Sequence, residues 1–272
     1  DNTGFEFVLN TKNFQRDDFT WSTSLNFAYN KNEIKSLPND NNDIVSGQNI
    51  NRVGESVNSF YIIEYAGVDP ANGDALYYTN TPNEDGSLSK ETTTNPNDAR
   101  RIVAASPFPD WYGGITNNIN FKDFDFSFTF QGEFGASIYN GGGRFQSASA
   151  DYFDNQTLDQ YTDRWQNPGD VTDVPQARLF GANGTAQSTR YLDESDFIRL
   201  RNITLGYSLP QEVIDRYGFT NIRVYITGVN LATITNYGGF DPEARSDAGG
   251  VGQEFYSSPP AKTLSVGLNV NF

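Results

Sequence analysis

The sequence of 272 residues contains no cysteine, no histidine and no methionine. Without cysteine, the segment has no disulfide, no thiolate metal site and no cysteine nucleophile. Without histidine, it has no imidazole zinc ligand and no histidine-dependent catalytic triad, which excludes most familiar enzyme chemistries.

Basic residues are also scarce, because 19 lysines and arginines stand against 34 acidic residues and give a net charge of -15. Such a balance argues against nucleic acid as a partner, since binding phosphates needs a surplus of basic residues on one face. No apolar run reaches the roughly 18 residues of a membrane helix, and no signal peptide is evident. The chain begins at Asp1 and has no methionine, so we expect it not to be a complete translation product.

Aromatic residues, asparagine and glycine are abundant. Aromatics make up 14% of the chain, with 21 Phe and 15 Tyr, and there are 30 Asn and 25 Gly. A disordered acidic chain would be poor in aromatics, whereas this composition is typical of β-strands and turns.

Apolar and polar residues alternate along several segments. In 124–134, phenylalanine fills the even positions except Gly132, and the odd positions carry no apolar residue. This period of two indicates strands with one apolar and one polar face. The alternation predicts seven strands, at 4–13, 19–30, 111–122, 124–134, 197–209, 220–230 and 264–272.

The predicted strands are long, and their connections alternate in length. Most run about 10–13 residues, close to the roughly 9–11 that cross a bilayer, whereas globular strands run about 5–6. Short connections at 14–17, 122–123 and 210–218 alternate with long ones at 31–110, 135–196 and 231–260. Short periplasmic turns opposite long extracellular loops are typical of outer-membrane barrels. We therefore favour an all-β fold, part of a transmembrane antiparallel β-barrel, over a soluble carbohydrate-binding β-sandwich.

Two connections carry predicted structure of their own. In the first long loop, β-like runs at 60–65 and 75–79 flank Asn72-Gly73, a dipeptide favoured in hairpin turns. We predict that these runs form an extracellular hairpin. The 210–218 connection has proline near its start and glycine at its end, which predicts one helical turn.

Acidic and glycine-rich segments suggest sites only weakly. Asp40–Asp43 and Asp69–Asp74 have spacing that resembles calcium loops but lack the terminal glutamate, so solvated turns are favoured. The run from Gly141 to Gly143 lacks the lysine of a phosphate loop, so we expect a flexible loop segment there. Paired acids at Asp193, Glu194 and Asp196 are interpreted as a solvated loop rather than as a glycosidase pair.

Aromatic residues in the long loops are the candidate ligand contacts, because rings with a polar edge suit sugars and peptides. The alternative is that they pack the loop onto itself or onto a partner. Aromatics at strand ends (Trp21, Tyr29, Trp111 and Tyr207) are expected in interfacial belts instead. The candidate contacts are Tyr139, Tyr152, Tyr161, Trp165 and Tyr237.

The chain ends on an aromatic residue in phase with the apolar face of its last strand. Leu268, Val270 and Phe272 carry this pattern. It resembles the insertion signal that the barrel-assembly machinery reads in outer-membrane proteins.

Several segments resemble the SusC/RagA family of TonB-dependent transporters, in the family's order and through nearly all of the chain. These segments are 67–73 (GVDPANG), 111–115 (WYGGI), 197–207 (FIRLRNITLGY), 224–231 (VYITGVNL), 241–243 (DPE) and 267–272 (GLNVNF). The resemblance implies a barrel of about 22 strands, a plug domain and a TonB box. It also implies a SusD-like surface lipoprotein that acts as a lid. Seven strands cannot close such a barrel, so we expect residues 1–272 to be its C-terminal part, with the plug outside this segment.

On this resemblance we expect part of an outer-membrane importer for a bulky nutrient, a glycan or an oligopeptide. Energy would come through TonB acting on the missing plug, so we expect no catalytic residue, no cofactor, no metal site and no enzyme activity. The long loops would face the cell exterior and the C-terminus the periplasm of a Gram-negative bacterium. The expected partners are the SusD-like lipoprotein, TonB through the missing N-terminal part, the barrel-assembly machinery and outer-membrane lipid. The alternative is a SusC-like barrel that serves as a scaffold in an outer-membrane assembly, without transport of its own.

Overall fold

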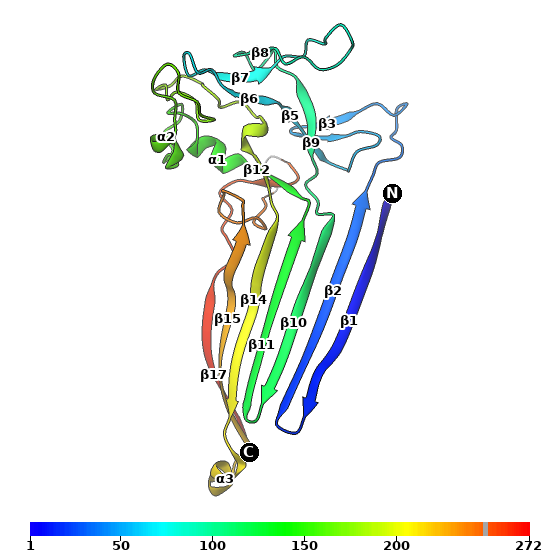
Figure 1. The fold of residues 1–272 in the computed structure, drawn as a ribbon, viewed down its shortest axis with the longest axis vertical. Helices are drawn as coiled ribbons and strands as arrows, with labels where there is room; N and C mark the ends of the chain where they lie inside the picture. The colour runs from blue at the N-terminus through cyan, green and yellow to red at the C-terminus, as the bar shows by residue number, and fades with distance from the viewer. Residues whose placement is uncertain (247–249) are drawn as a thin grey trace.

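A curved antiparallel sheet of seven long strands forms the main body of the computed structural model, which describes residues 1–246 and 250–272 (Figure 1). Its strand order, β1-β2-β10-β11-β14-β15-β17, follows the chain without crossovers. The strands are β1 (Asn2–Arg16), β2 (Phe19–Asn32), β10 (Trp111–Phe121), β11 (Phe124–Phe134), β14 (Phe197–Ser208), β15 (Asn221–Thr235) and β17 (Thr263–Asn271). These confirm the seven strands predicted from the alternation. The sheet does not close on itself, as expected of part of a barrel.

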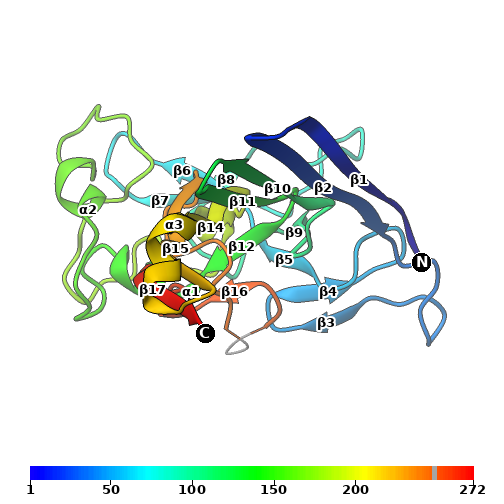
Figure 2. The same ribbon diagram turned by 90° about the horizontal axis from the view of Figure 1, so that it is seen from below.

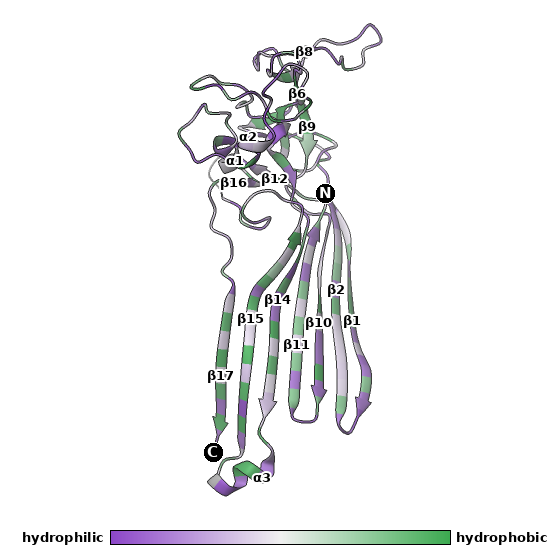
Figure 3. Ribbon diagram, turned by 60° about the vertical axis from the view of Figure 1, so that its left-hand side comes forward, coloured by the Kyte–Doolittle hydropathy of each residue, from purple (hydrophilic) through white to green (hydrophobic). Residues whose placement is uncertain are grey.

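The pairing register gathers apolar side chains on one face of the sheet. Reading across four strands, Phe126 pairs with Leu205, Leu205 with Ile226, and Ile226 with Val266. The adjacent row of Ser127, Thr204, Thr227 and Ser265 is polar and faces the other way, since neighbouring strand residues point to opposite faces. Figure 3 shows the resulting alternation of hydrophobic and hydrophilic colour along the strands. The apolar face is largely exposed, with Leu205 47% and Val266 76% accessible.

Aromatic rows border the apolar face at both ends of the strands. At the loop end, Tyr29 pairs with Trp111, and their ring centroids lie 4.3 Å apart. At the turn end, Phe124 pairs with Tyr207 at 4.7 Å. Trp21 lies one row further in and stacks on Phe14. These positions are those of the interfacial belts expected at the strand ends.

The short connections lie at one end of the sheet and the long connections at the other, as predicted (Figure 1). The tight turns and the 209–220 connection lie at one end. In that connection, α3 (Gln211–Ile214) and η2 (Asp215–Tyr217) follow Pro210 and end at Gly218, whose φ of +75° is left-handed. This confirms the helical turn expected there, because glycine adopts that conformation without steric cost.

Short strands form a folded layer at the opposite end, and Figure 2 shows several of them projecting over the concave side of the sheet. The first long loop contains two small sheets, and the second and third loops share another. Their strands are β3 (Ile44–Ser46), β4 (Asn49–Asn51), β5 (Ser59–Ile63), β9 (Arg101–Ala105), β6 (Tyr65–Val68), β7 (Ala75–Tyr78), β8 (Thr92–Thr93), β12 (Ser137–Asn140), β13 (Leu192–Glu194) and β16 (Gln253–Glu254).

The hairpin predicted in the first loop exists, but one of its strands was assigned wrongly. The Asn72-Gly73 turn joins β7 to β6, where Val68 pairs with Ala75. The apolar run at 60–65 instead supplies mainly β5, which pairs with β4 and β9. Alternation alone could not separate these adjacent runs, because both are short and apolar.

A small apolar core holds the loop layer together. Phe60 and Ile62 of the first loop pack with Tyr139 and Tyr191 of the second. All four side chains are at least 95% buried. The first two loops therefore fold as one unit.

Helices are few and short. They are α1 (Gly141–Gln146), α2 (Asp159–Thr162) and η1 (Thr189–Tyr191), besides α3 and η2. The prediction of a flexible loop segment at Gly141–Gly143 is wrong, because these residues begin α1. Asn140 caps this helix by accepting a hydrogen bond from the Gly143 amide. Among the described residues, no helix combines the length and the apolarity that crossing a membrane requires.

At the same depth in the membrane, a charged side chain is expected to destabilise the barrel on the apolar face of a strand but not on the polar face. Val266→Arg places a cation on the apolar face of β17, at a cost of about 2–4 kcal/mol near a bilayer midplane. Ser265→Arg, its neighbour on the polar face, is the control. In the full-length receptor, we expect Val266→Arg to lower the folded, heat-modifiable band in outer-membrane fractions and Ser265→Arg to leave it near the wild-type level. Equal loss in both variants would contradict the assignment of faces.

Candidate functional site

Two arginines on β14 face the polar side of the sheet near the loop end. Arg199 and Arg201 are two residues apart. Arg201 is an extra residue relative to β11, because the adjacent Thr129 and Phe130 pair with Asn202 and Leu200. A bulge of this kind redirects side chains. Both guanidinium groups consequently reach the third long loop.

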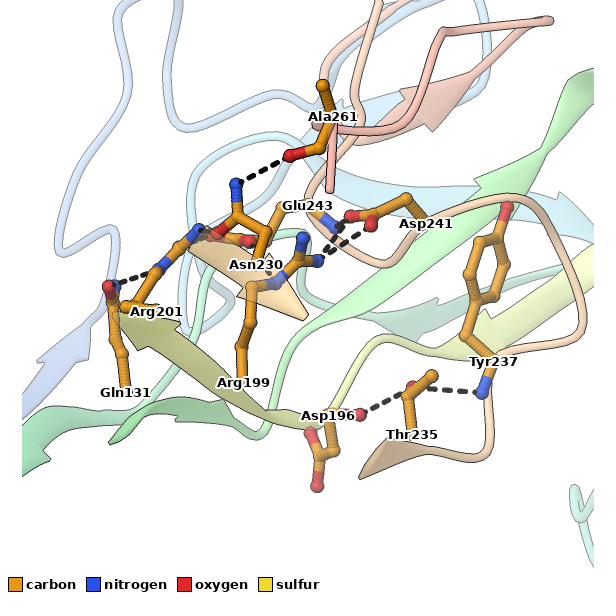
Figure 4. A network of polar contacts seen from close by, with 10 residues as sticks. All are labelled: Gln131, Asp196, Arg199, Arg201, Asn230, Thr235, Tyr237, Asp241, Glu243 and Ala261. Atoms are coloured by element: carbon orange, nitrogen blue, oxygen red, sulfur yellow. Dashed lines mark hydrogen bonds and ion pairs between the residues drawn. The ribbon is translucent and has the colours of Figure 1, made fainter. Parts of the chain in front are cut away.

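Ion pairs join these arginines to the Asp241-Pro242-Glu243 segment (Figure 4). Arg199 Nη2 lies 2.7 Å from each carboxylate oxygen of Asp241, and Arg199 Nε lies 2.9 Å from Glu243 Oε2. Arg201 pairs with Glu243 and donates a hydrogen bond of 2.7 Å to Gln131 Oε1 on β11. The third loop is thereby fixed to the sheet wall.

Burial makes this network energetically important. The Arg199 side chain is 1% exposed and that of Asp241 7%. Removing one member of a buried ion pair leaves an uncompensated charge and costs about 3–5 kcal/mol. Only residues 231–246 and 250–260 of the predicted third loop are described, and the network holds the first of these ranges.

Beside this network, the loop layer contains a partly open cavity of about 620 Å³. Its walls come from α1, α2, β13, β16 and the third loop around Gly239 and Phe240. A volume of this size is in the range that accommodates small organic ligands. The lining includes the carboxylates of Asp159, Asp173, Asp193 and Glu254, with Arg190 as the single cation among the lining residues.

Two of the cavity carboxyls are partly removed from water. Burial raises the pKa of the Asp193 and Glu254 carboxyls above the usual range, because a poorly solvated carboxylate resists ionisation. Glu254 is 1% exposed, and its Oε1 accepts a hydrogen bond of 2.8 Å from the Ser257 amide. The described residues that line the cavity include no nucleophile–base pair, so the cavity suits binding rather than reaction.

The five predicted aromatic contacts divide by burial. Tyr139, Trp165 and Tyr237 are 1%, 5% and 6% exposed. Tyr139 packs in the loop core, and Trp165 Nε1 donates a hydrogen bond of 3.0 Å to the Pro70 carbonyl. Burial favours the packing alternative for these three, so the ligand-contact prediction now depends on half-buried Tyr152 and on Tyr161, which is 74% exposed.

The acidic turns have structural partners. Asp43 pairs with Arg52, and Asp74 pairs with Arg178 of the second loop. Asp69 accepts a hydrogen bond from the Ala71 amide within its own turn. In the part of the chain that the structure describes, no group of three or more acidic side chains has the arrangement of a metal site.

Sequence reasoning missed the network and the cavity carboxylates as sites. The 197–207 and 241–243 segments were identified only through resemblance, and the structure shows that they contact each other. Two arginines spaced i, i+2 in an apolar strand were the available signal, because a strand places them on one face. Nothing local distinguished Asp193 from the neighbouring acids.

Comparison with known proteins gives consistent relatives, although no protein-family model matches the sequence. TonB-dependent receptor P3 of Formosa agariphila is 32% identical over 293 residues, and SusC of Bacteroides thetaiotaomicron is 28% identical over 288. These matches cover 100% of this chain but 29% and 26% of the relatives. A solved structure described as the RagAB peptide transporter matches with a TM-score of 0.81 at 28% identity, covering 100% of this chain and 29% of that one.

The sheet and these relatives together define a segment of an outer-membrane β-barrel of the TonB-dependent receptor class. Within that class the chain is similar to SusC and to the RagAB transporter, in agreement with the resemblance to the SusC/RagA family seen in the sequence. It spans less than a third of the length of these relatives. They are receptors and transporters rather than enzymes, in agreement with the expectation for this chain.

Removing the carboxylate of Asp241 tests the network. In the full-length receptor, we expect Asp241→Asn to destabilise the third loop by at most about 3–5 kcal/mol, because buried Arg199 loses one of its two charged partners and keeps Glu243. Limited proteolysis should then cut faster within 236–262. Asp43→Asn, which breaks an exposed pair in the first loop, is the control and should leave cleavage unchanged. Unaltered cleavage in Asp241→Asn would show that the ion pairs do not hold the loop.

Proposed function

We propose that this chain is the C-terminal part of the barrel of a TonB-dependent importer that takes up a bulky nutrient, a glycan or an oligopeptide. The long loops face the cell exterior, and the C-terminus faces the periplasm. Leu268, Val270 and Phe272 serve as the insertion signal for the barrel-assembly machinery. The nutrient class follows the description of RagAB as a peptide transporter and the expectation for the family.

The observation that carries this proposal is the folded loop layer with its cavity at one end of the sheet. A layer built only to cover the barrel would need no polar cavity of about 620 Å³. On the polar face below it, Ser127, Thr129, Gln131 and Glu133 form a row that contacts water or the plug. TonB acts through that plug, which lies outside this segment, so the chain needs no catalytic residue.

An exposed apolar patch on the second loop is the proposed docking surface for the SusD-like lipoprotein. The rings of Phe153 and Phe180 lie 5.2 Å apart. Large exposed apolar patches mark interaction sites, because leaving them in water is unfavourable. Phe153 (90% exposed) and Phe180 (62%) form the centre of this surface. The second loop also exposes Leu158 (75%), Tyr161 (74%), Val171 (94%) and Leu179 (75%).

Docking is tested by point substitutions, because deleting 135–196 would also remove the core that supports the first loop. We expect Phe153→Ser with Phe180→Ser to lower co-purification of the lipoprotein with the full-length receptor by about tenfold, through loss of apolar contact area. Leu88→Ser, at an exposed position of the first loop, is the matched control. Undiminished co-purification in the double variant would remove the patch from the interface.

Transport itself is tested with and without TonB. We expect cells that carry the full-length receptor to take up labelled peptide or glycan fragments only when TonB is present. The amount of receptor at the surface should be the same in both strains. A receptor that binds its lipoprotein but supports no TonB-dependent uptake would instead match the scaffold alternative.

A further inference from the structure

The cavity in the loop layer carries an excess of negative charge that the described residues do not neutralise. Its carboxylates come from separate elements: Asp159 from α2, Asp173 from the segment after it, Asp193 from β13 and Glu254 from β16. Among the described residues, none of the four forms an ion pair. Four carboxylates therefore face one guanidinium, that of Arg190.

The hydrogen bonding of these carboxylates is sparse. Within the part of the chain that the structure describes, the carboxylates of Asp173 and Asp193 accept no hydrogen bond. The Asp159 carboxylate accepts one hydrogen bond, from the side-chain amide of Gln160, and its length of 3.5 Å is at the limit for a hydrogen bond. Asp173 is exposed and faces water, whereas Asp159 and Asp193 are half-buried. Carboxylates that are partly removed from water normally have hydrogen-bond or ionic partners, so the wall around Asp159 and Asp193 is incomplete without a donor.

Arg190 does not supply that donor. Its Nη1 donates to the carbonyls of Ser147 and Gly184, both at 3.1 Å, and to the Tyr191 hydroxyl at 2.7 Å. These neutral acceptors hold the guanidinium on the side of the cavity next to the loop core. The Arg190 guanidinium is thus hydrogen-bonded to main-chain carbonyls of the second loop and not to the cavity carboxylates.

A buried hydroxyl next to the cavity also lacks a partner. Tyr237 is 6% exposed, and its hydroxyl makes no hydrogen bond among the described residues. It lies behind Gly239, where a Cβ atom would come within 2.2 Å of it. The glycine therefore leaves room for the Tyr237 hydroxyl directly behind the cavity lining. Burial raises the pKa of Tyr237, and the nearby carboxylates of Glu254 and Asp193 raise it further.

We propose that this cavity binds a cationic group of the imported nutrient, an ammonium or guanidinium carried by a basic peptide or an amino sugar. The inference rests on the proposed function and adds a charge preference to it. An organic cation with several N–H donors can satisfy carboxylates that approach from different elements, because each donor reaches its own acceptor. The cavity volume suits a group of that size.

Binding to the purified full-length receptor in complex with its lipoprotein tests this preference. The probes are trilysine, trialanine, the glucosamine trimer and the N-acetylglucosamine trimer, measured by calorimetry at low salt. We expect trilysine to bind at least about tenfold more tightly than trialanine, or the glucosamine trimer to exceed its N-acetylated form by a similar factor, since each charged hydrogen bond contributes on this scale. The first result identifies a peptide source and the second a glycan source.

Isosteric variants locate the effect. Asp193→Asn and Asp159→Asn, at the two half-buried aspartates of the lining, should each reduce the preference for the cationic probe by about tenfold, because the amide keeps the shape but removes the charge. Glu194→Gln, an exposed neighbour on β13, is the matched control and should leave the preference intact. Heat-modifiability of each variant establishes that its barrel is folded.

Three outcomes would overturn the inference: equal affinity for cationic and neutral probes, a preference that survives both aspartate variants, or binding of calcium that only these variants abolish. TonB-dependent uptake of neutral peptides or glycans alongside any of these would leave the proposed function standing. Absence of uptake for every probe would count against the proposed function, while the calorimetric result would still decide the charge preference.

Discussion

The structure depends on one constraint, which is that hydrocarbon offers no hydrogen-bond partner to a peptide backbone. Each long strand must therefore pair along its length with its neighbour, and β11 does so with both β10 and β14. Pairing in register places residues such as Phe126 and Ile226 on the lipid side and Thr204 and Thr227 on the other. The hydroxyls of these two threonines lie 2.9 Å apart, so the polar face also forms lateral contacts. Residues beyond the aromatic belts are free of this constraint, and there the chain forms long loops.

The loops acquire structure by other means, because they lie in water. An apolar core around Phe60 and Tyr139 joins the first two loops, and buried ion pairs from Arg199 hold the third loop against the wall. Both devices fix the walls of a cavity whose own charges remain unmatched. A rigid frame of this kind fits the proposed cation site, because a preorganised site loses less entropy when its ligand binds. The same rigidity explains why single substitutions test this layer better than deletions.

The sheet could be predicted from the sequence because its information is local. A period of two along 124–134 gives strand, face and length together, and the alternation of short and long connections gives the two ends. The loop layer was predicted less well. Its strands are short, so β5 and β6 could not be separated by pattern, and the Arg199–Asp241 contact joins residues 42 positions apart. Burial of Tyr139 and Trp165 likewise arises from contacts between different loops, which composition and spacing do not encode.

The most direct test of the account is cysteine scanning along β11 in a cysteine-free, full-length receptor, since this chain contributes no cysteine of its own. Single cysteines at even positions from Phe124 to Phe130, and at odd positions from Asp125 to Gln131, are labelled with a fluorophore in the membrane. We predict that lipid-borne quenchers reach the even positions and aqueous quenchers the odd ones. Equal access of the aqueous quencher to both sets would contradict a strand that has lipid on one face and the barrel interior on the other.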